Sequence, residues 1–241
     1  METKISTGSF DLNKWLYGGY EKDIITTIYG PAGSGKTNFC ILAAASQAKK
    51  GNKVIFIDTE GGFSVERLKQ ILSDEYENAL ENIILMKPTT FQEQWDAFSK
   101  LLKEIKSSKA ISLIIVDGMT MLYRLELAES REDVKKVQEI NSKLARQMRM
   151  LAEISRKHAI PVIVTNQVYS EFQTEEDFKK GIKKSVNMVG GDILRYWSKC
   201  LIELQNNNGK RKAILRKHRS LEEKELVFYI TNSGIRKKGW L

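Results

Sequence analysis

The octet from residue 30 to residue 37 has the composition and spacing of a loop that binds phosphate. It reads GPAGSGKT, which completes the pattern G-x-x-x-x-G-K-[ST]. Its glycines let backbone N–H groups approach phosphate oxygens, and a helix that begins within the loop adds its positive dipole end. Lys36 would bridge the β- and γ-phosphates, and the Thr37 hydroxyl would bind Mg²⁺. The predicted nucleotide contacts are Gly30, Pro31, Ala32, Gly33, Ser34, Gly35, Lys36, Thr37 and Asn38.

The surrounding sequence favours a phosphate site over a glycine-rich turn without a ligand. Chance supplies such an octet in about 1% of chains of this length. Residues 24–29 predict a strand directly before the loop, and residues 36–50 predict a helix directly after it. Phosphate binding requires this order of strand, loop and helix. The sequence therefore predicts that ATP binds here.

A magnesium-bound triphosphate needs a carboxylate near the loop, and Asp117 meets this requirement. Asp117 ends the apolar run LIIVD, where an aspartate either terminates the strand or binds the metal. The phosphate loop upstream favours the metal role. Thr37 and Asp117 are therefore the predicted Mg²⁺ ligands.

Two further predicted strands end in polar residues. Glu60, in VIFIDTEGG, lies where a carboxylate could orient or deprotonate an attacking water, whereas we expect Asp58 to support local structure. The run IPVIVTNQ ends in Asn166 and Gln167, whose amides could contact a γ-phosphate. Ligands bind at the carboxyl ends of strands in open α/β sheets, so we expect these residues to share one site. The predicted catalytic residues are Glu60, Lys36 and Gln167.

The elements that must position these residues alternate along the chain. Strands are predicted at residues 24–29, 53–58, 83–86, 111–117 and 160–165, and helices at residues 36–50, 65–80, 91–106 and 132–158. This alternation is typical of an α/β fold with a mainly parallel β-sheet flanked by helices. A helix at 192–198 and strands at 201–204, 212–216 and 225–230 follow, and we expect these strands to be antiparallel additions at one edge. No linker-like segment interrupts residues 1–241, so we expect a single domain.

The composition excludes several classes of protein. The 241 residues are 41% hydrophobic and 29% charged, which is atypical of disordered and of membrane-spanning chains. The two cysteines lie far apart and match neither a zinc site nor a disulfide framework. The first residues lack the apolar segment of a signal peptide. We therefore expect a soluble intracellular protein, located in the cytoplasm and without membrane contact.

Most of the net charge of +9 lies near the C-terminus. Residues 209–241 hold ten Lys/Arg against three Glu, a net charge of +7. Such a segment indicates an acidic partner, nucleic acid first, although a solvated basic surface is the alternative. The candidate DNA contacts are Lys210, Arg211, Lys212, Arg216, Lys217, His218 and Arg219.

The order of these motifs resembles the ATPase core of the archaeal RecA/RadA recombinases. The segments that carry the resemblance are ISTGSFDLNKWLYGG, GPAGSGKT, FIDTEGGFSVERL, LIIVD, VTNQV and GGDIL, from about Lys4 to Arg236. The resemblance implies a RecA-like P-loop NTPase core. It also implies that Glu60 activates water, that Gln167 senses the γ-phosphate, and that Arg67 contacts adenine, although an arginine early in a helix is often a surface residue.

Several features depart from a full recombinase. About 23 residues precede the first core strand, too few for an N-terminal helix-hairpin-helix domain, and they hold no Phe-x-x-Ala linker. The two segments that correspond to the DNA-binding loops, residues 123–134 and 169–191, are rich in acids. Asp192 follows the paired glycines where RadA usually has histidine. These departures argue against ordinary filaments.

The remaining pattern most resembles the RadB family, which are archaeal paralogues of RadA. This resemblance implies an accessory factor of homologous recombination and DNA repair that binds ATP, hydrolyses it slowly and binds DNA, single-stranded or junction. It implies RadA and a Holliday junction resolvase as partners, and allows a homo-oligomer. One alternative is a filament-forming strand-exchange recombinase. Another is a KaiC-like regulatory ATPase or autokinase without DNA binding, because the tract 217–219 also resembles the Lys-x-Arg element of those proteins.

Overall fold

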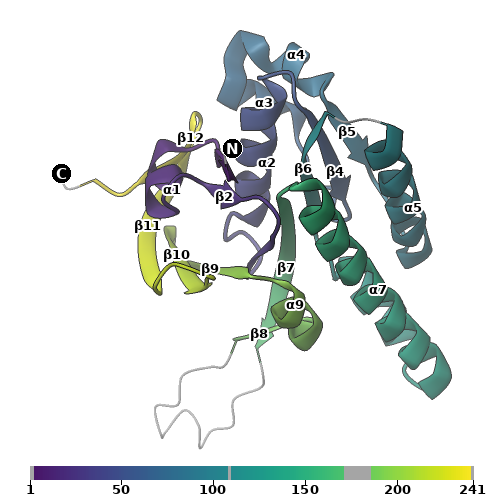
Figure 1. The fold of residues 1–241 in the computed structure, drawn as a ribbon. Coiled ribbons are helices and arrows are strands. Elements are labelled where there is room, and N and C mark those ends of the chain that lie inside the picture. Colours follow the sequence, from purple (N-terminus) through teal and green to yellow (C-terminus); the bar gives the residue numbers. More distant parts are fainter. Residues whose placement is uncertain (1–2, 108–109, 171–185, 240–241) are drawn as a thin grey trace, which may run out of the picture.

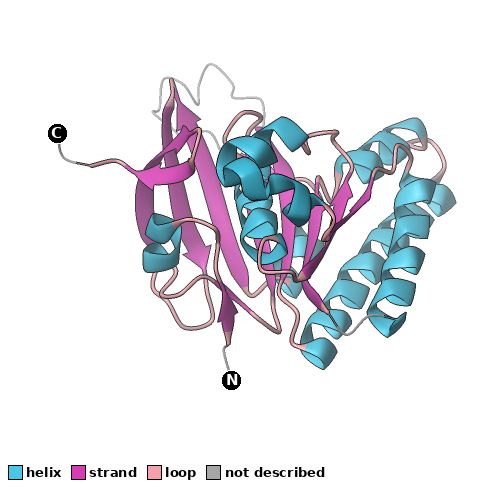
Figure 2. Ribbon diagram, turned by 90° about the horizontal axis from the view of Figure 1, so that it is seen from above, coloured by secondary structure: helices cyan, strands magenta, loops and turns pink. Residues whose placement is uncertain are grey.

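A mainly parallel β-sheet with helices on both faces organises the chain (Figures 1 and 2). The computed structural model describes residues 3–107, 110–170 and 186–239. The order across the large sheet is β12-β11-β10-β9-β3-β7-β6-β4-β5, and β8 pairs with β7 beside this path. The strands are β1 Lys4–Ile5, β2 Tyr20–Glu21, β3 Ile25–Gly30, β4 Lys53–Asp58, β5 Ile83–Met86, β6 Ile111–Asp117, β7 Val162–Ser170, β8 Val186–Met188, β9 Cys200–Asn207, β10 Lys210–Lys217, β11 Lys224–Thr231 and β12 Gly234–Lys237.

The helices form two layers, each over its own apolar cluster. The helices α1, α2, α3 and α4 cover one face of the sheet, and α5, α6, α7 and α9 cover the other. Their bounds are α1 Phe10–Trp15, α2 Lys36–Ala48, α3 Val65–Leu72, η1 Ser73–Glu75, α4 Tyr76–Leu80, α5 Phe91–Ser107, α6 Met121–Glu129, α7 Val134–His158 and α9 Gly191–Trp197. No helix in the described ranges is long and apolar enough to cross a membrane.

Burial on both faces explains the apolar strands at the centre of the sheet. β6 pairs in parallel with β4 and β7, and residues 113–117 are buried. Such a strand reads as a continuous apolar run because helices cover it on both sides. The predicted α/β fold with a mainly parallel, helix-flanked sheet is confirmed.

The periodicity of the longest helix shows which side it buries. In α7, Ile140, Leu144, Met148 and Leu151 recur every three or four residues and are all buried. Asp133 caps the helix by accepting a hydrogen bond from the N–H of Lys136. The helix therefore lies against the sheet along one stripe and leaves its charged side in solvent.

The C-terminal strands differ from the prediction in one respect. β10 and β11 are antiparallel to their neighbours, as expected, and so is the additional strand β12, but β9 pairs in parallel with β3. The prediction that residues 201–204 form an antiparallel strand is confirmed for the pairing with β10 and wrong for the pairing with β3. The helix α9 precedes β9 and serves as the crossover that lets β9 run in the same direction as β3.

Several short elements were not predicted, and one predicted helix is interrupted. The segment 65–80 is α3, η1 and α4, because Ser73 has a φ of 51° that ends α3. The elements α1, β1, β2 and β12 are too short to show a periodic pattern. Residues 121–129, which include the start of the segment assigned to a first DNA-binding loop, form α6. Most of the second predicted loop, residues 171–185, lies outside the described residues.

Candidate nucleotide-binding site

The phosphate loop joins β3 to α2 and leaves the first turn of that helix open. Gly33 and Gly35 have φ values of 71° and 107°, which only glycine adopts without strain. Gly35 is the N-cap of α2 and offers no side-chain cap, so the amides of the first turn stay available to an anion. Gly30 has no room for a side chain, because a Cβ there would lie 2.3 Å from the carbonyl oxygen of Leu204.

Lys36 is a buried cation held at the mouth of the loop. Its Nζ donates hydrogen bonds to the carbonyl oxygens of Gly30 at 2.9 Å and Pro31 at 3.0 Å. Burial lowers the pKa of Lys36, while the nearby carboxylates of Glu60 and Asp117 oppose that shift. No carboxylate forms an ion pair with Lys36 in the described part of the chain, so its charge suits an incoming phosphate.

Asp117 and Thr37 border the same small space beside the loop. Asp117 is buried, and its Oδ1 accepts a hydrogen bond of 2.6 Å from the Thr165 hydroxyl. Its Oδ2 is buried without a well-formed hydrogen bond among the described residues. A Cβ on Gly62 would lie 3.2 Å from Thr37 Oγ1 and 3.5 Å from Asp117 Oδ2, so both oxygens face one cradle. Burial raises the pKa of Asp117, and the Thr165 and Thr37 hydroxyls lower it in part.

This oxygen pair fits Mg²⁺. Mg²⁺ prefers oxygen ligands, and usually takes one or two carboxylates together with substrate phosphates. Within the described ranges no three His, Cys, Asp or Glu side chains gather as a metal site. A metal here would therefore be held by the Asp117 carboxylate, the Thr37 hydroxyl and the phosphates of the ligand itself.

Glu60 and Gln167 meet on the open side of the loop. Gln167 Nε2 donates a hydrogen bond of 3.1 Å to Glu60 Oε2. Asp58 takes no part in this contact, because its carboxylate accepts the N–H groups of Gly62 at 3.1 Å and Phe63 at 2.9 Å. Asp58 therefore shapes the turn that presents Glu60, the supporting role expected for it.

Lys36, Thr37, Glu60 and Gln167 line one cleft of about 360 Å³. Its walls include the phosphate loop, Glu60, Gln167 and, from the C-terminal strands, Arg211 and Ile230. The sequence assigned Arg211 to DNA contacts and did not foresee it here. The alternation along residues 211–215 could have indicated this position, because it puts Arg211 on the same face of the strand as the apolar residues Ala213 and Leu215.

Arg67 lies beside the loop and outside the walls of this cleft. Its Nε donates a hydrogen bond of 2.8 Å to Asn38 Oδ1, and one guanidinium nitrogen contacts Gln70 and the carbonyl oxygen of Asn232. Burial lowers its pKa. The predicted contact with adenine thus remains a prediction, with Asn38 linking the arginine to the loop.

Comparison with known proteins assigns the family. The model of the Rad51 family matches residues 2–238. The chain belongs to the Rad51 family. It is 42% identical over 224 residues to the DNA repair and recombination protein RadB of Methanocaldococcus jannaschii, covering 93% of this chain and 98% of that protein. The protein of the same name from Methanobrevibacter smithii is 39% identical over 236 residues, covering 96% and 95%.

These matches confirm the predicted resemblance to archaeal RadB proteins and the RecA-like class of the fold. A third RadB protein, from Methanococcus maripaludis, is 40% identical over 225 residues. Proteins of the Rad51 family in general bind ATP with Mg²⁺. The cleft described above holds the residue types that such binding needs.

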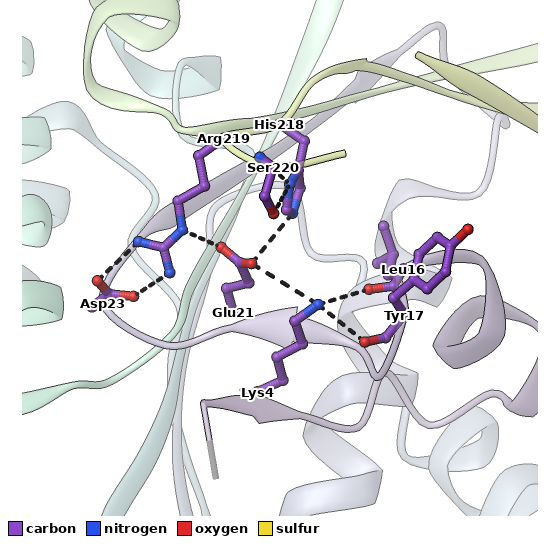
Figure 3. Close-up of polar contacts among 8 residues, drawn as sticks. All are labelled: Lys4, Leu16, Tyr17, Glu21, Asp23, His218, Arg219 and Ser220. Carbon is purple, nitrogen blue, oxygen red and sulfur yellow. Dashed lines mark hydrogen bonds and ion pairs between the residues drawn. The ribbon is translucent and has the colours of Figure 1, made fainter. Parts of the chain in front are cut away.

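Three of the seven residues predicted to contact DNA, Lys212, Arg216 and Arg219, form ion pairs with carboxylates within the fold. Figure 3 shows Arg219 between Glu21 and Asp23: its Nε lies 2.5 Å from Glu21 Oε2, and two other nitrogens contact both Asp23 oxygens. Arg216 forms ion pairs with Glu203 and Glu223. These contacts favour a structural role for both arginines.

The other predicted DNA contacts differ in how far they are engaged by the fold. Lys212 lies 2.8 Å from Glu225, and Lys217 donates to two backbone carbonyl oxygens. The side chain of His218 is 3% exposed, and burial lowers its pKa against the opposing effect of Glu21. Lys210 is exposed and has no ion pair in the described part of the chain.

Proposed function

We propose that this protein binds Mg²⁺-ATP and hydrolyses it slowly, and that it acts with DNA as an accessory factor of homologous recombination and DNA repair. One observation carries the proposal: Lys36, Thr37, Glu60 and Gln167 line one cleft at the carboxyl ends of neighbouring strands. The buried Asp117 carboxylate lies beside Thr37. Membership of the Rad51 family and the names of the RadB relatives support it.

The chain's own residues account for the chemistry. Glu60 orients or deprotonates a water for attack on the γ-phosphate, and Gln167 holds the Glu60 carboxylate in position. Lys36 and the amides of the loop stabilise the negative charge that develops on the phosphate oxygens. Mg²⁺ would supply charge neutralisation beside Thr37 and Asp117.

Because several of the basic residues are engaged within the fold, we propose a different DNA surface on the C-terminal strands. The register pairs Tyr229 with Arg236 and Arg211 with Phe228, and continuing it places Lys210 beside Tyr229. Lys210 and Arg236 are exposed, and Tyr229 is 39% exposed between them. A base can stack on such an aromatic ring while cations contact phosphates, so we name Lys210, Tyr229 and Arg236 the outer basic row and propose that it binds DNA.

The proposed partners follow the resemblance alone. We propose RadA and a Holliday junction resolvase as protein partners, single-stranded or junction DNA as the nucleic acid, and a cytoplasmic location. A strand-exchange filament and a KaiC-like regulatory ATPase remain the alternatives. Lys217 does not favour the KaiC-like alternative, because its Nζ is held by the carbonyl oxygens of Arg195 and Ser198 at 2.9 Å each.

The rate of ATP hydrolysis with and without single-stranded DNA tests the proposal. We expect slow turnover by the wild type and a loss of about 100-fold or more in Glu60→Gln, which keeps the hydrogen bond acceptor but removes the base. ATP binding by Glu60→Gln should be retained. Strong stimulation of turnover by DNA, with continuous filaments in electron micrographs, would favour the recombinase. Absence of DNA binding at low salt would favour the KaiC-like ATPase.

A further inference from the structure

Arg211 faces away from the other basic side chains of β10. Side chains alternate along a strand, so Arg211 lies on the same face as Ala213 and Leu215, which are buried in the core beside α2. Arg211 pairs with Asn206 of β9 and with Phe228 of β11. Its position is therefore fixed by strands on both sides.

The strands around Arg211 contact the phosphate loop directly. Asn206 Nδ2 donates a hydrogen bond of 3.3 Å to the carbonyl oxygen of Gly33. The side chain of Ile230 lies 3.0 Å from the position of a Cβ on Gly35. Arg211 thereby reaches the cleft lined by Lys36, Glu60 and Gln167, although it is far from the loop in sequence.

The charge of Arg211 has no partner in the described part of the chain. Its Nε is buried without a hydrogen bond, and no carboxylate there forms an ion pair with it. Its neighbours on β10 differ, since Lys212 and Arg216 are paired with glutamates. A buried donor without an acceptor costs free energy, and a guanidinium fits phosphate with two parallel hydrogen bonds.

We propose that Arg211 binds the phosphate groups of the nucleotide from within the same chain. This inference rests on the proposed binding of ATP in the same cleft. Phosphate-loop sites receive such a cation either from the same chain or from a partner, and here Arg211 of the C-terminal sheet lines the cleft. The contact also joins the nucleotide to the β9–β10 turn, and so to the outer basic row on the opposite face of β10.

Equilibrium binding of a fluorescent ATP analogue with Mg²⁺, and of ADP, tests the role of Arg211. We expect Arg211→Gln to raise the Kd for the triphosphate about ten- to a hundredfold, the range for a lost hydrogen bond to a charged group. Arg211→Lys should recover part of this loss. Arg146→Gln is the matched control, because Arg146 is exposed on α7 at the other face of the sheet. Its Kd should stay within about twofold of wild type.

Amide hydrogen exchange distinguishes a phosphate contact from a merely structural role of Arg211. We expect Mg²⁺-ATP to slow amide exchange across residues 206–211 in the wild type and in Arg146→Gln, but not in Arg211→Gln. Thermal unfolding without nucleotide should be nearly the same for Arg211→Gln and wild type, because the Nε of Arg211 has no hydrogen bond to any of the described residues.

The outcomes separate this inference from the proposed function. If the wild type binds ATP, Lys36→Ala loses binding and Arg211→Gln binds normally, the role of Arg211 is refuted and the ATP site stands. If the wild type binds no nucleotide at all, both proposals are refuted. If Arg211→Gln unfolds without nucleotide, the folded variant Arg211→Lys decides. A Kd for ATP equal to that of the wild type, with the same slowing of amide exchange by Mg²⁺-ATP, would then refute the role of Arg211.

Discussion

Replacing Arg219 by alanine should destabilise the fold, because Arg219 neutralises a nearly buried carboxylate. The side chain of Glu21 is 8% exposed, and Arg219 is its near partner at 2.5 Å. After Arg219→Ala, the remaining cation of the network is Lys4 at 3.9 Å, with His218 at 3.8 Å when protonated (Figure 3). Removing one partner of a fully buried ion pair costs about 3–5 kcal/mol. Arg219 is 43% exposed, so water replaces it in part and we expect a loss of about 1–2 kcal/mol.

A double-mutant cycle in urea measures this contact. Arg219→Ala and Glu21→Gln should each lower the free energy of unfolding, and the double variant should lose less than the sum by about 1 kcal/mol. Much of this coupling should persist in 0.5 M NaCl, because Glu21 is shielded from solvent. Arg146→Ala removes one exposed arginine and should change stability by less than about 0.5 kcal/mol. A stable Arg219→Ala, or strictly additive effects with Glu21→Gln, would refute this reasoning.

Three further experiments test other parts of the structure. Gly30→Ala puts a Cβ 2.3 Å from the Leu204 carbonyl oxygen, so we expect a loss of about 1–3 kcal/mol in urea unfolding together with weaker ATP binding; an unchanged protein would contradict the close approach of β3 and β9. Asp117 has a pKa raised by burial above its ordinary value of 3.8, so folding favours its neutral form and its contribution to stability is lost as the pH rises through the raised pKa. In EDTA, Asp117→Asn should therefore melt above wild type at pH 7 and lose this advantage below about pH 4; a lower melting temperature at pH 7 would contradict it. Lys210→Ala and Arg236→Ala should each reduce the salt slope of DNA binding by about one, whereas Arg146→Ala should not; equal slopes would remove the outer basic row as the DNA surface.

The sequence predicted the centre of the fold well because strong local patterns coincide there with the final packing. Residues 53–58, 83–86 and 111–117 are strands with the predicted bounds. Their apolar runs are long enough to be recognised, and two of them end at an aspartate, Asp58 and Asp117. The carboxyl ends of these strands and of β7 also predicted that Glu60, Asp117 and Gln167 lie near one another, and Glu60 and Gln167 do line one cleft.

The C-terminal sheet shows what sequence patterns do not contain. The direction of β9 depends on the crossover through α9, and three strands in succession suggested an antiparallel arrangement. The net charge of residues 209–241 also overstated the number of cations available to DNA, because a net charge does not show which cations are paired with carboxylates elsewhere in the chain. Glu21 and Asp23, which neutralise Arg219, lie almost 200 residues earlier in the chain.

Arg211 illustrates the same limit at the scale of one side chain. KRK at residues 210–212 is a uniform basic run in the sequence, but alternation sends its middle residue to the nucleotide cleft. Alternation can be predicted from sequence. Which face of β10 meets the phosphate loop depends on the pairing of β9 with β3, which is a contact between distant segments.

The central claim is that the cleft at the phosphate loop binds a magnesium-bound nucleotide through Lys36 and Asp117. Titration of a fluorescent ATP analogue, in Mg²⁺ and in EDTA, tests it most directly. We predict saturable binding by the wild type that weakens in EDTA, a loss of about 100-fold in Lys36→Ala under both conditions, and a loss in Asp117→Ala that appears only with Mg²⁺. Binding by Lys36→Ala that equals wild type, or wild-type binding indifferent to Mg²⁺, would contradict the claim.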